Sequence, residues 1–143
     1  MSLNRWESLG FVINHLARLL ATDLADHLRP HEVTIGQYPL LLALWEEEGI
    51  TQTGLSLRLN IEPATTTNTL NRMERDGLVE RQPDPDDQRG SRIYLTDHGR
   101  ALEEPVTKAA RAVNARAQQN LSAGEAVDLG HMLAKVRRGL EKE

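Results

Sequence analysis

The segment from Thr51 to Leu95 joins two short helical patterns, a tight turn and two alternating runs of residues without a gap. Leucines at helical spacing follow Thr51, whose hydroxyl group is suited to cap a helix there. Asn60 tolerates the left-handed backbone of a tight turn, and Pro63 suits the first position of a second helix, which is expected to stop at Gly77. Two short helices joined by such a turn predict a helix-turn-helix.

The second helix of this pair has one apolar face and one face made only of polar groups. Thr66, Leu70 and Met73 share the first face, while the other offers hydroxyl, amide and guanidinium groups. Such groups read base edges in a major groove, since an amide pairs with adenine and threonine offers a hydroxyl and a methyl group. A solvated polar face without a partner is the alternative. The residues expected to face DNA on this helix are Thr65, Thr67, Asn68, Asn71 and Arg72.

Two runs of alternating residues, Leu78–Arg81 and Ser91–Leu95, follow directly. A polar segment with two prolines, residues 82–90, separates them, which predicts a β-hairpin around a loop. A hairpin directly behind a helix-turn-helix is a wing. The tip of a wing can lie along the phosphates and enter the minor groove, where the negative potential favours arginine. Arg89 is the wing residue expected to make this contact.

Two helices are predicted ahead of this unit. A six-turn amphipathic helix is expected from about Asn4 to Leu28, with leucines recurring every four residues. Thr34 and Gln37 then form a capping box before another helix, which is expected to end near residues 48–49. The apolar stripe of the first helix needs a large partner surface, which is either ordinary core or a seam with another subunit.

Two further helices are predicted behind the hairpin. Thr96 can cap a long helix over residues 97–120. Ser122 and Glu125 form a second capping box, which opens a last helix through Leu140.

The predicted fold is therefore mainly α with a small β-hairpin wing, in the order α-α-α-α-β-β-α-α. One domain is expected over residues 1–143. Its winged helix-turn-helix part covers residues 34–96, and its helical dimerisation part covers residues 1–30 and 97–143.

Composition removes several classes of function. The chain has no cysteine, which excludes disulfides, thiolate metal clusters and a cysteine nucleophile. Its five histidines show no convincing ligand spacing, and it contains neither a glycine-rich phosphate loop nor a nucleophile elbow. No metal, cofactor, catalytic residue or enzyme activity is expected. Because the longest apolar run, residues 39–45, is too short for a membrane span and no signal peptide is visible, we expect a cytoplasmic protein.

The charge balance bears on the choice of partner. A net charge of −4, from 17 basic and 21 acidic side chains, excludes a uniformly basic surface. DNA affinity would depend on a few placed arginines, foremost Arg72 and Arg89, and on the doubling of contacts in a dimer. The weak charge also favours the main alternative, which is a winged-helix protein that contacts other proteins, or a helical ligand-binding protein, without DNA binding.

Taken together, these segments resemble the multiple-antibiotic-resistance regulator (MarR) family over nearly the whole chain. The segments that carry the resemblance are residues 36–41, 55–60, 71–81, 84–89 and 95–99. The resemblance implies a homodimeric bacterial or archaeal transcription factor, expected to be a repressor, that binds a palindromic double-stranded operator. In many members a small phenolic or aromatic acid releases the DNA, and the lack of cysteine excludes the branch that senses thiol oxidation. The resemblance also implies that Asp87 holds the Arg89 side chain or the wing backbone, the alternative being an exposed pair of little energetic weight.

The sequence departs from the family pattern at several positions. Asn68 and Gln88 stand where arginine is common, and Glu62 stands where a Ser or Thr cap is common. These three changes lower the positive charge at the expected DNA face, which bears on affinity and site preference rather than on the fold. Gly54 and Ser56 replace the usual Glu and Ala of the preceding helix.

The resemblance finally implies a ligand pocket between the dimer helices and the winged part. Arg18 would meet a carboxylate there, and Tyr38 and Trp45 would wall an aromatic ring. The alternative is that Tyr38 and Trp45 are core residues. The residues expected to bind the ligand are His15, Arg18, Tyr38 and Trp45.

Overall fold

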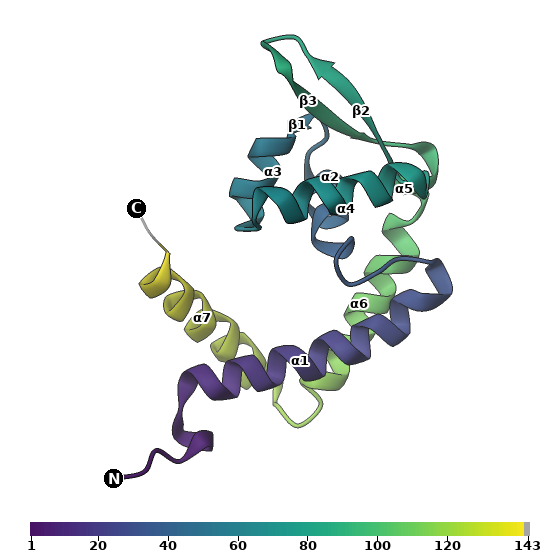
Figure 1. Cartoon of the computed structure of the whole chain (residues 1–143). Helices are drawn as coiled ribbons and strands as arrows, with labels where there is room; N and C mark the ends of the chain where they lie inside the picture. The colour runs from purple at the N-terminus through teal and green to yellow at the C-terminus, as the bar shows by residue number, and fades with distance from the viewer. Residues whose placement is uncertain (142–143) are drawn as a thin grey trace.

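The computed structural model of the chain describes residues 1–141 and is mainly helical with one small sheet, which confirms the predicted fold class (Figure 1). The last two residues of the predicted dimerisation part, Lys142 and Glu143, lie outside the described residues. In chain order the elements are α1 (Leu9–Leu28), α2 (Tyr38–Glu46), β1 (Ile50–Thr51), α3 (Gln52–Leu59), α4 (Pro63–Arg75), β2 (Val79–Asp84), β3 (Asp87–Leu95), α5 (Asp97–Ala101), α6 (Glu103–Ala117) and α7 (Ala123–Leu140), with short 3-10 turns at Arg5–Glu7 and Arg29–His31.

The capping predicted from the sequence is present at several helix ends. Thr51 accepts a hydrogen bond of 3.0 Å from the backbone N–H of Gly54 at the start of α3. Ser122 and Glu125 form a complete capping box at α7. Asn60 ends α3 in the left-handed conformation, with φ 52°. These contacts span at most three residues of chain, so the local sequence is sufficient to predict them.

Helix α2 begins later than predicted. Thr34 and Gln37 make the two reciprocal capping bonds, of 3.1 and 3.2 Å, but the helix starts only at Tyr38 and ends at Glu46. Because Pro39 has no N–H to donate to the carbonyl four residues back, the chain before it forms a turn rather than a first helical turn.

The prediction of one long helix over residues 97–120 is wrong, because the chain divides at Leu102 into α5 and α6. Pro105 cannot donate to the carbonyl of Ala101, and its ring would clash with that carbonyl in a continuous helix. Pro105 instead lies in the first turn of α6, where no such bond is required.

The predicted hairpin is present, but the predicted loop over residues 82–90 is wrong. Strand β2 continues to Asp84 and β3 starts at Asp87, so the turn consists of Pro85 and Asp86. Both faces of this part of the hairpin are largely exposed, and polar side chains therefore do not interrupt the pairing of the two backbones. A polar segment argues against a strand only where one face of the sheet must be buried, because a fully solvated hairpin can carry polar side chains on both faces.

Strand β1 was not predicted. Its two residues pair with β3, Ile50 opposite Ile93, which gives an antiparallel sheet in the order β1-β3-β2. Two residues are too few to show any alternation. The strand therefore exists only because the hairpin folds back beside it.

The buried core lies mainly in the winged part. The buried side chains of α2, α3, α4 and the sheet include Leu40, Leu41, Leu44, Leu55, Leu70, Met73 and Ile93. Helix α1 reaches this core through Leu28, and α6 reaches it through Val106. Figure 1 shows α6 descending from the winged part and crossing the long α1 below it.

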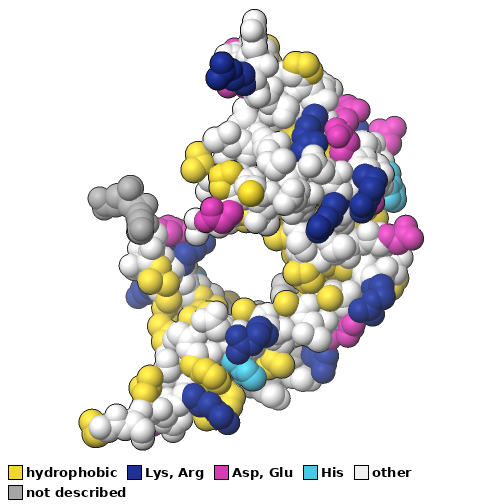
Figure 2. All heavy atoms as spheres, in the orientation of Figure 1, with side chains coloured by type: hydrophobic (Ala, Val, Ile, Leu, Met, Phe, Trp, Pro, Cys, Tyr) yellow, Lys and Arg dark blue, Asp and Glu magenta, His cyan; other side chains and the backbone are white. Residues whose placement is uncertain are grey.

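Helices α1 and α7 leave most of their apolar side chains in water. No residue of α7 is buried, and Leu28 is the one buried residue of α1. Figure 2 shows apolar side chains gathered over the lower half of the molecule, beside an opening between α7 and the winged part. The large exposed apolar residues of the two helices are Leu9, Ile13, Leu16, Leu19, Leu20, Val127, Met132, Leu133 and Leu140. Within the described residues, no helix is both long and apolar enough to cross a membrane.

Candidate nucleic-acid interface

Helix α4 is anchored by one face and open on the other. Its buried side includes Leu70 and Met73, both with no exposed surface, together with two threonines. The opposite side is polar and exposed, and no hydrogen bond or ion pair engages its side chains within residues 1–141. The residues with these free side chains are Thr65, Asn68, Asn71 and Arg72. Four of the five residues predicted to read DNA from this helix thus point into solvent with their polar groups unused.

Thr67 is placed differently from the other four. Its hydroxyl group donates to the carbonyl of Pro63 at 3.0 Å and accepts from the side-chain amide of Gln52 at 2.6 Å. The hydroxyl therefore uses its donor and one of its two acceptor lone pairs inside the protein. Thr67 ties the start of α3 to α4, and this arrangement suits a residue that positions the helix.

The tip of the wing carries an exposed, unpaired arginine. The carboxylate of Asp87 accepts the backbone N–H of Arg89 at 3.0 Å, so it holds the wing backbone. The guanidinium of Arg89 makes no ion pair with a described residue. A shallow groove beside it is lined by the start of α3 and by the wing, including Gln52, Thr53 and Ser91.

A second wing arginine, which the sequence did not single out, donates from all three of its nitrogens to groups inside the protein. Arg92 donates to the carboxylates of Asp84 (3.0 Å) and Asp86 (3.2 Å) and to the carbonyl of Gly49 (2.9 Å). The backbone N–H of Asp86 and then the Arg92 guanidinium lower the pKa of Asp84, and Asp84 in turn raises the pKa of Arg92. The only signal in the sequence is the cluster of three acidic residues within positions 84–87 at the wing, which favours a cation nearby.

Two more polar contacts fix α4 and the sheet against α2. Gln37, which is 2% exposed, donates to Asp76 at the end of α4 at 3.0 Å, and this bond is the main cause of the lowered pKa of Asp76. Glu48 accepts the backbone N–H of Leu95 at 2.9 Å and pairs with Arg100, which lowers the pKa of Glu48. Neither contact was predicted.

The four predicted ligand residues are not brought together within one chain. His15 stacks on Phe11 near the start of α1, with ring centroids 5.8 Å apart, and Arg18 is exposed on the same helix. Trp45 packs on the core and donates its indole N–H to the carbonyl of Gly99 at 3.0 Å. Tyr38 also packs on the core, and burial raises its pKa. Tyr38 and Trp45 are therefore partly buried against the core, and their role in a ligand pocket stays a prediction.

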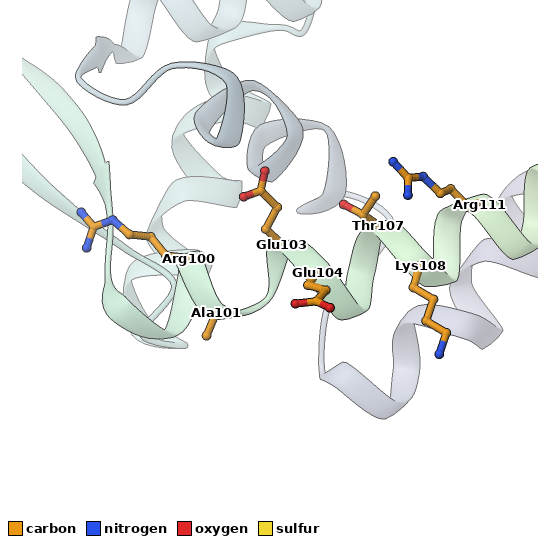
Figure 3. Close-up of a pocket in the computed structure, with 7 residues that line it drawn as sticks. All are labelled: Arg100, Ala101, Glu103, Glu104, Thr107, Lys108 and Arg111. Carbon is orange, nitrogen blue, oxygen red and sulfur yellow. The ribbon is translucent and has the colours of Figure 1, made fainter.

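A surface depression along α5 and α6 gathers charges of both signs. Figure 3 shows that its side chains diverge, with Glu103 and Arg111 on one side of α6 and Glu104 and Lys108 on the other. Because these groups do not converge on a common point, the depression shows no ligand site. Among the described residues, no cluster of three or more His, Asp or Glu side chains is arranged to hold a metal ion.

Known proteins with similar sequences and structures are transcriptional regulators. Residues 33–91 match the model of the MarR family. The multiple antibiotic resistance protein MarR of Escherichia coli is 31% identical over 129 residues, which cover 90% of each chain. The HTH-type transcriptional regulator TtmR of Methylorubrum extorquens is 45% identical over 95 residues, which cover 66% of this chain but only 49%, about half, of TtmR. A crystal structure of a mutant MarR from Escherichia coli complexed with operator DNA aligns with a TM-score of 0.86 at 29% identity, covering 95% of this chain and 99% of that chain.

Proposed function

Because this chain belongs to the MarR family of transcriptional regulators, we propose that it binds operator DNA and represses transcription there. The observation that carries the proposal is the free polar face of α4, with Asn68 and Arg72 at its centre, next to a wing whose Arg89 is unpaired. Amide and guanidinium groups suit base edges in the major groove, and an arginine at a hairpin tip suits the minor groove. The proposal includes a cytoplasmic location, because a protein that binds operator DNA works beside the chromosome.

Homodimer formation is part of the proposal. Support comes from α7, an 18-residue helix with no buried residue, and from the apolar face of α1. Helices in proteins gain most of their stability from packing an apolar face, and exposed apolar patches mark interaction surfaces. A second copy that buries α1 and α7 would cover these faces and set two α4 helices about one DNA turn apart, roughly 34–36 Å.

A charge on the apolar face of α1 is expected to separate the dimer. Leu16 is 49% exposed in one chain, and Leu16→Glu would bury a carboxylate at the interface, which is strongly unfavourable. Sedimentation equilibrium should then give the mass of one chain, 16.0 kDa, in place of twice that mass. Leu42→Glu on α2 is the matched control, because it makes the same change at a partly exposed leucine of the winged part, outside α1 and α7, and should leave the mass unchanged. A wild-type monomer, or a dimeric Leu16→Glu variant, would contradict the proposed interface.

Selection of bound fragments from genomic DNA, followed by sequencing, tests the proposed function directly. We expect a palindromic motif with half-sites one helical turn apart. We also expect affinity for that motif to fall steeply with salt, since phosphate contacts release counterions. Binding that depends on neither sequence nor salt would favour a protein-contact role for the winged helix, or a helical ligand-binding protein, instead.

Release by a small aromatic acid is the remaining part of the proposal. The exposed guanidinium of Arg18 on α1 is available to a carboxylate. Titration calorimetry with a panel of aromatic acids should give binding heat for the wild type and a weaker signal for Arg18→Ala. The absence of heat with every acid of the panel would argue against this class of ligand.

A further inference from the structure

One side chain, Arg92, joins the tip of the wing to the segment that precedes β1. Its Nε donates to Asp84 at 3.0 Å, its Nη2 donates to Asp86 at 3.2 Å, and its Nη1 donates to the carbonyl of Gly49 at 2.9 Å. Arg92 itself lies in the central strand β3, opposite Gln82 of β2. The guanidinium therefore crosses the sheet and uses donors on three of its nitrogens to hold two carboxylates and one carbonyl.

Asp84 depends strongly on this contact. Its side chain is 7% exposed, whereas that of Asp86 is 81% exposed. Asp84 lies at the irregular pairing between β2 and β3, and its carboxylate also accepts the backbone N–H of Asp86 at 3.0 Å. A carboxylate with so little access to water is costly unless a cation and hydrogen bonds compensate it, and Arg92 supplies the cation.

From Gly49 a short chain of contacts leads to α4. Gly49 is followed directly by β1, whose second residue, Thr51, caps α3. The next residue, Gln52, donates to Thr67 on α4 at 2.6 Å. The wing tip and the DNA-facing helix are thus connected through Arg92, the Gly49 carbonyl, β1 and the start of α3.

We propose that Arg92 is a positioning residue that fixes the wing relative to α4, so that Arg89 reaches the minor groove while α4 lies in the major groove. The proposal rests on the proposed DNA-binding function. Arg92 acts through Arg89, because each of its three nitrogens already donates to a group inside the protein, which holds the guanidinium against the wing and the Gly49 carbonyl. We call the Arg92 contacts with Asp84, Asp86 and Gly49 the wing strut.

The direction in which operator affinity changes distinguishes the wing strut from a simple effect of net charge. Removing an acidic residue near DNA should tighten binding if charge alone matters, because phosphates repel carboxylates. Asp84→Asn removes the buried partner of Arg92, and we expect it to weaken operator binding about tenfold. Glu80→Gln removes the same charge at an exposed position of β2, where the carboxylate accepts from Gln82 and not from Arg92, and we expect unchanged or tighter binding. Tighter binding by Asp84→Asn would overturn the proposal.

A double-mutant cycle tests whether Arg92 works through Arg89. Arg92→Ala should weaken binding in the wild-type background, but should have little further effect in the Arg89→Ala background, because the contact it positions is already lost. Equal losses in both backgrounds would overturn the proposal, since Arg92 would then contact DNA itself or act on the whole fold. Arg92→Lys keeps the charge without the forked geometry, so it should recover only part of the affinity.

Hydrogen exchange of the wing amides separates failure of the wing strut from failure of the proposed function. In the free protein, Arg92→Ala should speed exchange over residues 82–92 while the amides of α4 keep their protection. This measurement needs no DNA, so it tests the wing strut even if the wild type binds no operator. Unchanged exchange in the wing would overturn the wing strut, while absence of operator binding by the wild type would overturn the proposed function. General loss of protection together with a lowered Tm would assign Arg92 to the stability of the whole fold and would also overturn the proposal.

Discussion

Arg89→Ala is expected to weaken operator binding by at least about 100-fold. A hydrogen bond made by a charged group contributes about 1.5–3 kcal/mol, and a dimer would lose the contact twice. If each Arg89 neutralises one phosphate, the slope of log K against log salt should fall by about 2 for the dimer, close to 0.9 for each lost contact. Fluorescence anisotropy titrations at several salt concentrations measure both quantities.

The position of Arg89 in the wing makes this substitution interpretable. Its guanidinium has no ion-pair partner among the described residues, so its loss should leave the Tm close to that of the wild type. Arg75→Ala is a useful comparison. That guanidinium is also exposed, but it pairs with Asp76 at 3.2 Å at the end of α4. Equal binding by wild type and Arg89→Ala, at all salt concentrations, would remove the wing from the mechanism.

Gly99→Ala is expected to destabilise the protein by about 3 kcal/mol and to lower the Tm by about 10 °C. A Cβ atom on Gly99 would lie 2.2 Å from the carbonyl oxygen of Leu78 and 3.1 Å from a methyl group of Leu95. The nearer atom belongs to the backbone, so it cannot rotate away as a side chain would. Relief of this steric clash requires α5 to move, and that movement would also disturb the 3.0 Å hydrogen bond from the Trp45 indole N–H to the carbonyl of Gly99.

Thermal unfolding at a fixed protein concentration, followed by circular dichroism, measures the effect of this substitution. Gly36→Ala is the matched control, because it makes the same change in the turn before α2, where the new Cβ would meet only the Thr34 hydroxyl oxygen at an ordinary 3.9 Å. The backbone of Gly36 does not have a positive φ, so this variant should be unchanged or slightly more stable. A Gly99→Ala protein as stable as the control would contradict the close approach of α5 to the backbone of Leu78, directly before β2.

The helix-turn-helix and its wing were predictable because their signals are local. The Thr51 cap, the left-handed Asn60 and the Ser122 capping box each depend on a few consecutive residues. The polar face of α4 follows from helical periodicity alone. Local hydrogen bonding and side-chain spacing decide these features before any distant segment is in place.

Errors in the prediction arose where a local signal had two outcomes. Pro105 was compatible with a kinked helix or a broken one, and packing gave two helices that divide at Leu102. The polar residues 82–90 were compatible with a loop or a solvated hairpin, and backbone pairing gave the hairpin. In both places, interactions with the rest of the chain selected between conformations that the local sequence allows.

The sequence by itself determined most of the helices and their caps, the wing and the face of α4 that meets solvent, because each follows from residues within a few positions of one another. Only the tertiary structure decided what holds this face in place: Gln37 on Asp76, Trp45 on Gly99, and Arg92 between the wing and Gly49. These pairs are separated by 39, 54 and 43 residues. Whether such side chains meet depends on how the whole chain packs, and no local periodicity or motif specifies a contact between residues so far apart in the sequence.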